Sequence, residues 1–236
     1  MNRSFAAAVL VATTGLASAQ LTSTQLASFS GVPNFTSDVT AGVDSFLFDY
    51  FNAADFGDPA FVNLISAEIV ATAEIENGLL QVDNDGLDPA VINLAELGAS
   101  VVLSSDALAV ALPDVAPVTT TSFNLAANNG DDDSNFNNEP GDPDFGELLG
   151  VNVSDTNSEF FTQPLASLFE GAGQFDIDFT ALSIFNAGGV GGVSFAGTPV
   201  DITISVEVIY TYEIVPAPGA AALFGLGGLV AMRRRR

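Results

Sequence analysis

The sequence predicts an all-β protein: a single β-sandwich-like domain, preceded by an N-terminal signal peptide and followed by a short C-terminal apolar helix. Three observations predict this class. Several segments alternate apolar and polar side chains, clusters of turn-forming residues separate them, and 48% of the residues are hydrophobic. Many short strands at such spacing are typical of a sandwich. Disordered chains that are this acidic have a much lower hydrophobic content.

The first 19 residues have the three parts of a cleavable secretory signal. Arg3 supplies the positive start, residues 5–16 form an apolar stretch, and Ala17-Ser18-Ala19 is a small-x-small cleavage site before Gln20. The alternative is a buried N-terminal helix, but a cation followed by an apolar run and an Ala-x-Ala site is the export pattern. We therefore expect residues 1–19 to be removed and the mature chain to begin at Gln20.

Strands are expected along residues 20–214. The clearest is 200–214, in which apolar residues occupy every second position and only Ile209 interrupts the polar face. Residues 174–181 repeat this pattern. Residues 65–75 also alternate, and strand is preferred there although Ala and Glu favour helix as well. Shorter strands are predicted at residues 46–51, 79–82, 101–103, 107–112, 118–125 and 148–153.

Turn chemistry separates these strands, at Asn77-Gly78, Asp85-Gly86, Gly141-Asp142-Pro143 and the glycine-rich residues 188–192. No internal repeat and no linker divides the body. We therefore expect residues 20–214 to form one domain, which is long enough to bury a sizeable core.

All basic residues lie near the two ends, because the chain has no Lys, Arg or His between Arg3 and Arg233. All 29 acidic residues lie between these positions, and the formal net charge is −24. Binding of nucleic acid requires cations that replace phosphate counterions, so it is excluded for the body. Anionic lipid surfaces are excluded for the same reason, which leaves the C-terminal tail as the expected membrane contact. Such a negative field attracts divalent cations and basic partners.

The missing residue types also restrict catalysis. Without His, Cys or Lys in the body, neither an activated Ser or Cys nucleophile nor a zinc site based on His or Cys can be built. A hydrolase that uses only carboxylates is still compatible with the composition, but no Trp is present to form a sugar platform. We expect no enzymatic activity, and we assign no catalytic and no cofactor-binding residue.

The strongest local signal is the acidic loop at residues 128–147. Asp131-x-Asp133-x-Asn135 has EF-hand spacing and Asp142 falls at its twelfth position, but Phe136 stands where that turn needs Gly, so the loop is not an EF-hand. Two interpretations stay open: a solvated surface loop, and a Ca²⁺ site. The candidate ligands are Asp131, Asp133, Asn135, Asp142 and Asp144. Residues 83–88 are equally rich in oxygen but also read as an ordinary Asp-Gly turn.

Residues 215–236 form the tail. Val215-Pro216-Ala217-Pro218-Gly219 precedes an apolar run at residues 220–232 and then Arg233, Arg234, Arg235 and Arg236. This order of motif, apolar run and arginines resembles the PEP-CTERM sorting signal of Gram-negative bacteria, with Ala217 in place of the usual Glu. The resemblance implies recognition by a membrane exosortase and cleavage near Val215, Pro216, Ala217 and Pro218.

The body resembles the choice-of-anchor domains that precede such tails, and among them the type E group. The matching residues are Leu64-Ile65-Ser66-Ala67-Glu68-Ile69, Phe169-Glu170-Gly171-Ala172-Gly173-Gln174-Phe175-Asp176-Ile177 and Val208-Ile209-Tyr210-Thr211-Tyr212. This resemblance implies an exported, β-rich domain that is associated with extracellular polymer. It supplies no catalytic residues.

These observations predict an exported structural or interaction protein at the envelope surface or in the extracellular matrix of a Gram-negative-type bacterium. The expected partners are the secretion machinery, an exosortase-like sorting protease and extracellular polysaccharide. The alternative function is a calcium-dependent carbohydrate-binding module, with Ca²⁺ as its cofactor.

Overall fold

The computed structural model describes residues 20–31, 44–130, 142–188, 191–198 and 201–215. The predicted signal peptide, the apolar tail and the arginines lie outside these residues. Among the predicted Ca²⁺ ligands, Asp131, Asp133 and Asn135 also lie outside them, whereas Asp142 and Asp144 lie within.

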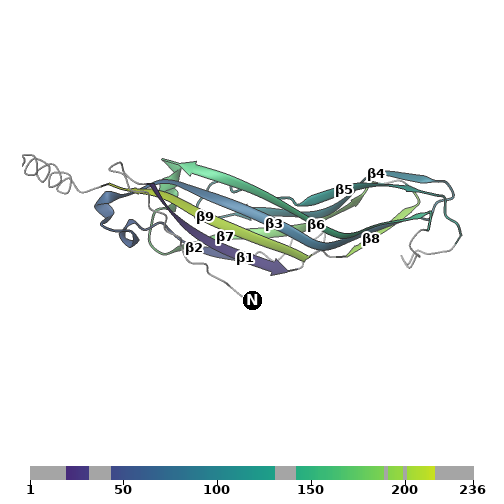
Figure 1. Ribbon diagram of the computed structural model, residues 1–236, viewed down its shortest axis with the longest axis horizontal. Coiled ribbons are helices and arrows are strands. Elements are labelled where there is room, and N and C mark those ends of the chain that lie inside the picture. The colour runs from purple at the N-terminus through teal and green to yellow at the C-terminus, as the bar shows by residue number, and fades with distance from the viewer. Residues whose placement is uncertain (1–19, 32–43, 131–141, 189–190, 199–200, 216–236) are drawn as a thin grey trace, which may run out of the picture.

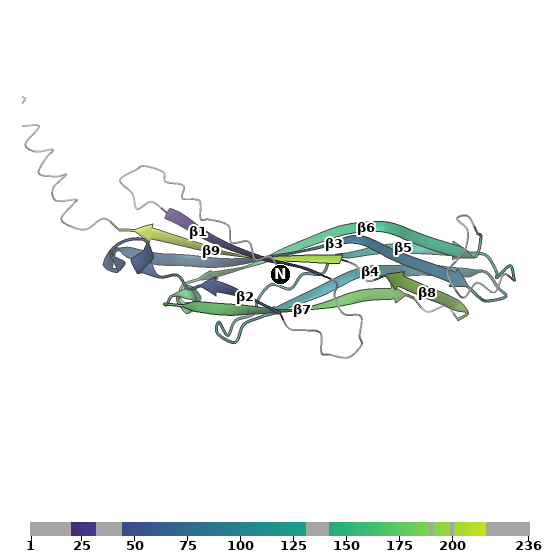
Figure 2. The same ribbon diagram turned by 90° about the horizontal axis from the view of Figure 1, so that it is seen from below.

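The described residues form two antiparallel sheets that face each other (Figures 1 and 2), which confirms the all-β prediction and gives the architecture of a β-sandwich. One sheet has the order β1-β9-β3-β6, with β8 also paired to β3, and the other has the order β2-β7-β4-β5. The strands are β1 (Gln20–Gly31), β2 (Asp44–Asp49), β3 (Val62–Asn84), β4 (Ala90–Ser104), β5 (Val118–Leu125), β6 (Phe145–Thr162), β7 (Gln174–Ala187), β8 (Val193–Thr198) and β9 (Asp201–Ile214). Three short 3-10 helices, η1 (Ala53–Asp55), η2 (Pro59–Phe61) and η3 (Leu165–Phe169), join them.

The central strand β3 sets the length of the molecule. It has 23 residues, so at the usual rise of a strand it extends about 70 Å. On one side it pairs with β6 along most of its length, and on the other side it pairs first with β9 and then with β8. The result is a long, narrow sandwich (Figure 1).

The core lies between the two sheets. Along β3, Ala67, Ile69, Ala71, Ala73 and Ile75 are fully buried, and they belong to the alternating segment for which strand was preferred over helix. The small Ala71 and Ala73 stand opposite the larger Val206 and Ile204 of β9. All of these side chains belong to one hydrophobic cluster.

Two local predictions were wrong. Asn77-Gly78 is not a turn between strands, because β3 continues through it with a register shift against β6. Asn77 takes a left-handed φ of 57° there, and its N–H donates to Asn152 Oδ1 at 3.1 Å. Asn and Gly both tolerate this backbone conformation, so the same pair suits a bulge as well as a hairpin.

Residues 107–112 do not form the expected strand. They lie in a turn and an extended loop after β4, and Leu108 is fully buried as part of the core. The apolar residues of this segment therefore reflect burial and not strand pairing. The sequence analysis also missed β1 and β8, whereas β5 coincides with the predicted segment at residues 118–125.

Candidate functional site

The acidic tip is one end of the sandwich, where the β3–β4 connection meets the β5–β6 connection. We define it as Asp83–Asp88, Asn128–Gly130 and Asp142–Asp144. The opposite end, which we call the tail end, holds η1, η2, η3 and Val215, the last described residue. Val215 is fixed there because its N–H donates to the carbonyl of Phe61 at 2.7 Å.

Backbone hydrogen bonds build the acidic tip from two segments that are far apart in the sequence. Asp83 pairs with Phe145 at the end of the β3–β6 ladder, and the N–H of Asn84 donates to the carbonyl of Asp144 at 3.0 Å. The N–H of Asn128 donates to the carbonyl of Gly86 at 2.9 Å. The structure thus joins the acidic loop and the residue 83–88 turn, which the sequence analysis treated as separate signals.

Asn84 organises this end from inside. Its side chain is 1% exposed. Its Nδ2 donates to the carbonyls of Asp88, at 2.9 Å, and of Ala126, and its Oδ1 accepts from the N–H of Gly86 at 3.1 Å. A buried amide whose donors and acceptor are all used thus ties its own turn to the connection after β5.

Asp144 is the most buried carboxylate of the acidic tip, with 1% of its surface exposed. Its Oδ2 accepts from the N–H of Asn129 at 2.8 Å, and Asn129 Nδ2 donates to Asp142 Oδ1 at 2.9 Å. Its other oxygen, Oδ1, is buried without a hydrogen-bond partner, one of two such side-chain atoms in the described chain together with Ser183 Oγ.

The predicted ligand set is thus partly assembled. The structure brings Asp142 and Asp144 together through Asn129. Within the described ranges, no group of three or more acidic side chains is arranged to hold a metal ion. Asn84, Asn128 and Asn129 lie within the two predicted oxygen-rich segments, but they were not among the predicted ligands. Asn84-x-Gly86 is a local turn signal that could have indicated a structural role for Asn84, but nothing local indicates its pairing with Asp144.

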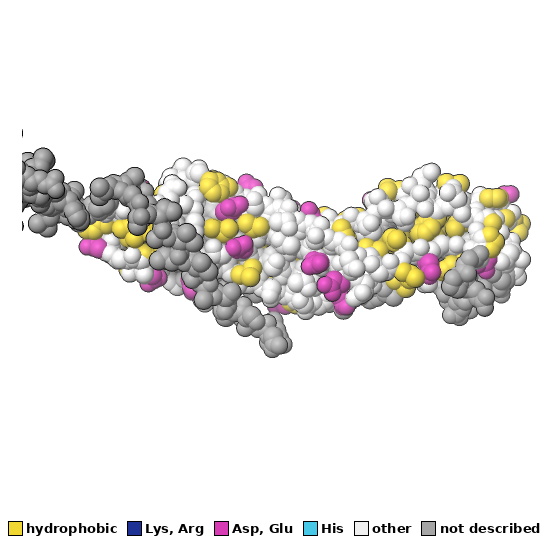
Figure 3. Space-filling view, in the orientation of Figure 1, with side chains coloured by type: hydrophobic (Ala, Val, Ile, Leu, Met, Phe, Trp, Pro, Cys, Tyr) yellow, Lys and Arg dark blue, Asp and Glu magenta, His cyan; other side chains and the backbone are white. Residues whose placement is uncertain are grey.

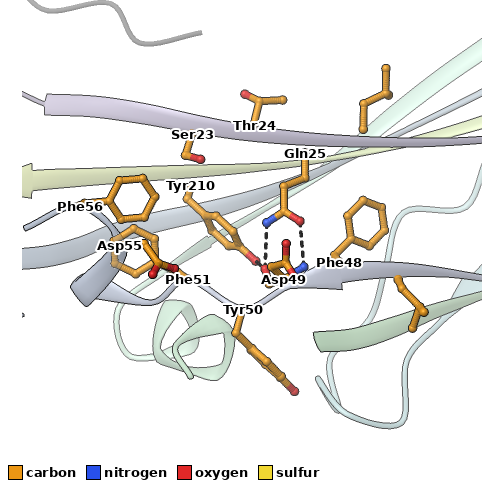
Figure 4. A pocket seen from close by; sticks show the side chains of 12 residues that line it. Ser23, Thr24, Gln25, Phe48, Asp49, Tyr50, Phe51, Asp55, Phe56 and Tyr210 are labelled. Carbon is orange, nitrogen blue, oxygen red and sulfur yellow. Dashed lines mark hydrogen bonds between the residues drawn. The ribbon is translucent and has the colours of Figure 1, made fainter. Parts of the chain in front are cut away.

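A pocket of about 330 Å³ lies near the tail end, between the edges of the two sheets (Figure 4). Rings from β2, from the residues on either side of η1 and from β9 line it together with polar groups of β1. Phe51 and Phe56 stack with their centroids 5.1 Å apart. Two carboxylates, those of Asp49 and Asp55, also border this pocket.

Gln25 crosses the pocket from β1 to β2. Its Nε2 donates to the carbonyl of Asp49 at 2.9 Å, and its Oε1 accepts from the N–H of Asp49 at 2.8 Å. The hydroxyl of Tyr210 donates to the same carbonyl at 2.8 Å. Burial raises the pKa of Tyr210 far above its ordinary value, with a further contribution from the negative charge of Asp49. The polar groups of the pocket are therefore largely occupied with joining the two sheets.

The exposed surface is anionic. Figure 3 shows carboxylates spread over one face among uncharged and apolar side chains, and the sequence has no Lys, Arg or His between Arg3 and Arg233. On β7, burial raises the pKa of Asp178, and repulsion from Asp176 and then Asp106 raises it further. The carboxylate of Asp178 thus has other carboxylates as neighbours, in a position where most proteins would have a Lys or Arg side chain.

The predicted apolar tail segment is not among the described residues. In the part of the chain that the structure does describe, no helix has the length and apolar content that crossing a membrane requires.

The chain has only weak structural similarity to the solved structures that it matches. No known family and no curated protein matches the chain. Weak matches among solved structures include the infectious bursal disease virus Gx strain, with 11% identity and a TM-score of 0.22, covering 97% of this chain and 54% of that one. Another is the T13 particle of the same virus, with 14% identity and a TM-score of 0.18, covering 84% of this chain and 41% of that one. The chain spans about half the length of these structures, and likeness at such TM-scores carries no argument.

Proposed function

We propose that this chain is an exported structural or interaction protein of the bacterial cell surface or extracellular matrix, sorted by residues 215–236. In this proposal, secretion removes residues 1–19, and an exosortase-like protease acts near Val215, Pro216, Ala217 and Pro218. The sandwich then acts as an anionic spacer that holds the acidic tip away from its point of attachment.

The observation that carries the proposal is the distance between Val215 and the acidic tip. Val215 follows β9 beside Phe61, near the start of β3, whereas Asn84 ends β3 at the tip. About 70 Å of strand therefore separates the two ends. Because residue 216 follows Val215 directly, the predicted sorting tail starts at the end opposite the acidic tip (Figure 1).

The other processing point supports the same geometry. Gln20, the first residue of β1, pairs with Glu213 of β9. Both predicted cleavage points therefore lie at the tail end, so processing would leave the two sheets and the acidic tip intact.

The test is to recover the protein from the bacterium that encodes it, fractionate the cells and measure its intact mass. The proposal expects an envelope or matrix protein that begins at Gln20 and lacks Arg233–Arg236. Such a protein has no Lys or Arg, so trypsin should leave it uncut even after denaturation.

Two variants sharpen this test. A chain that lacks residues 216–236 should be exported but lost from the envelope fraction. A matched variant with Pro216→Ala and Pro218→Ala keeps the apolar run and the arginines, and it should retain its tail and yield tryptic peptides that end in arginine. A cytoplasmic wild-type protein that starts at Met1 would contradict the proposal.

The calcium-dependent carbohydrate-binding alternative has less support. Such a module places its ion and its sugar-binding surface together. Here the pocket with the rings of Phe51 and Phe56 lies near the tail end, whereas Asp142 and Asp144 lie at the opposite end. Binding of extracellular polysaccharide therefore stays a prediction, to be tested with a glycan array in the presence of calcium.

A further inference from the structure

The carboxylate of Asp144 is buried in a domain that has no Lys, Arg or His side chain to pair with it. The residue is 1% exposed, and its Oδ1 has no hydrogen-bond partner in the described structure. Burial of a charge is strongly unfavourable unless the charge is paired and hydrogen-bonded. With no Lys, Arg or His between Arg3 and Arg233, the body itself cannot provide that pairing.

The position of Asp144 is set by the fold. The hydrogen bond from Asn84 N–H to the Asp144 carbonyl extends the β3–β6 ladder by one step beyond the pair of Asp83 and Phe145. Asn129 then orients the carboxylate by donating to Oδ2 at 2.8 Å. The backbone of Asp144 is therefore held by the end of β3, and its carboxylate is held by Asn129 of the same β5–β6 connection.

The neighbouring donors are directed to other acceptors. Gly86 N–H donates to Asn84 Oδ1, Gly130 N–H donates to Asn128 Oδ1 at 2.5 Å, and Asn129 Nδ2 donates to Asp142 Oδ1. The acceptors of these hydrogen bonds are the amide oxygens of Asn84 and Asn128 and a carboxylate oxygen of Asp142. This is the donor type that hard divalent cations prefer.

We propose that Asp144 anchors a divalent-cation site of the Ca²⁺ class at the acidic tip, with its buried Oδ1 as the direct ligand. Asp142 adds a second negative charge at the site. It is held near Asp144 because Asn129 donates hydrogen bonds to both carboxylates. Because the described residues offer no preformed group of three acidic side chains, neutral amide and backbone oxygens and water complete the coordination. With so few carboxylates, the expected Kd is about 0.1–1 mM, the range of extracellular calcium modules.

The ion would also stabilise the fold, since it binds where β3, β6 and the connection after β5 meet. A ligand that binds only the folded state raises the melting temperature according to its concentration relative to Kd. For a domain of this size, 10 mM Ca²⁺ should raise the melting temperature by about 3–11 °C. General screening of self-repulsion also stabilises an anionic protein, so the ionic strength must be kept constant.

The experiment measures the full chain in mild detergent at pH 7, by calorimetric titration with CaCl₂ and by thermal melting. NaCl keeps the ionic strength constant, and a chelator defines the calcium-free state. The expected results are one Ca²⁺ bound per chain and a rise in melting temperature that NaCl does not reproduce. No heat of binding in the wild type overturns the proposal whatever the variants do.

Substitutions of single acidic residues test which carboxylates bind the ion. Asp144→Asn should abolish the calcium-dependent shift, and it should melt at or above the wild-type temperature in chelator because it removes a buried charge. Asp142→Asn should weaken binding several-fold, and this second variant keeps the assignment testable if Asp144→Asn does not fold. Asp114→Asn, an exposed acid of the loop before β5, is the matched control and should keep the full shift. An unchanged shift in both Asp144→Asn and Asp142→Asn overturns the site.

This inference does not depend on the proposed function. The calcium titration uses purified protein, whereas the sorting test reads the location and the ends of the chain in cells. Failure of one therefore leaves the other intact.

Discussion

Gln25 and Asp49 join the edges of the two sheets through a pair of hydrogen bonds. The side-chain amide of Gln25 on β1 both donates to and accepts from the backbone of Asp49 on β2. The Gln25 amide thus makes the two hydrogen bonds that the backbone of a neighbouring strand would otherwise make with Asp49. Tyr210 of β9 donates to the same carbonyl, so three strands meet at one residue.

Replacement of Gln25 by Ala should destabilise the domain. Two hydrogen bonds are lost, but they are close to solvent and water can replace them in part, so we expect a loss of about 0.5–1.5 kcal/mol. Urea unfolding of Gln25→Ala measures this change, and Ser28→Ala on the exposed face of β1 is the control. Equal unfolding midpoints for Gln25→Ala and the wild type would show that the bridge does not contribute.

Tyr210 should make the protein sensitive to alkaline pH. Its pKa is raised in the folded state, so the stability that depends on its neutral form is complete below the ordinary tyrosine pKa. That stability is lost progressively as the pH rises above about 10, where the unfolded chain ionises first. Melting temperatures between pH 8 and pH 11 should therefore fall less steeply for Tyr210→Phe than for the wild type. At pH 8 the variant should be less stable by about 1 kcal/mol, because the bond to Asp49 is missing. Parallel melting curves across this range would argue against the assignment.

Asp178 should destabilise the protein at neutral pH. Its pKa is raised by burial and by the neighbouring carboxylates of Asp176 and Asp106. Protonation therefore stabilises the folded state, and that stability is lost as the pH rises through the pKa of Asp178. Asp178→Asn should melt at a higher temperature than the wild type at pH 7, and the difference should disappear near pH 3. Asp114→Asn serves as the control, and a difference that persists at acidic pH would contradict this explanation.

Gly98 is required by the close approach of β4 to β5. A Cβ atom at this position would overlap the carbonyl oxygen of Pro117 and lie 2.8 Å from the Cα of Val118, both of which are backbone atoms. Because no side chain can move aside, Gly98→Ala should cost about 1–3 kcal/mol. Gly191→Ala is the matched control, since no atom lies within 4 Å of its added Cβ. Chemical denaturation of both variants tests the prediction, which fails if they unfold at the same denaturant concentration.

The sequence by itself determined the kind of structure and the charge. The alternation in residues 65–75, 174–181 and 200–214 is a local property, and a period of two can bury one face only as a strand. The absence of cations from the body is likewise read directly from the residues. It predicts that the body does not bind nucleic acid and that its negative field attracts divalent cations and basic partners.

The tertiary structure decided which residues form the acidic tip. Asn84 and Asp144 are 60 positions apart, and they meet only because β3 and β6 pair in one particular register. Register depends on the packing of the whole buried face against the opposite sheet, so no short segment contains it. For the same reason Asn77-Gly78 was predicted as a turn: only the pairing with β6 and β8 shows that β3 continues through it and reaches Asn84.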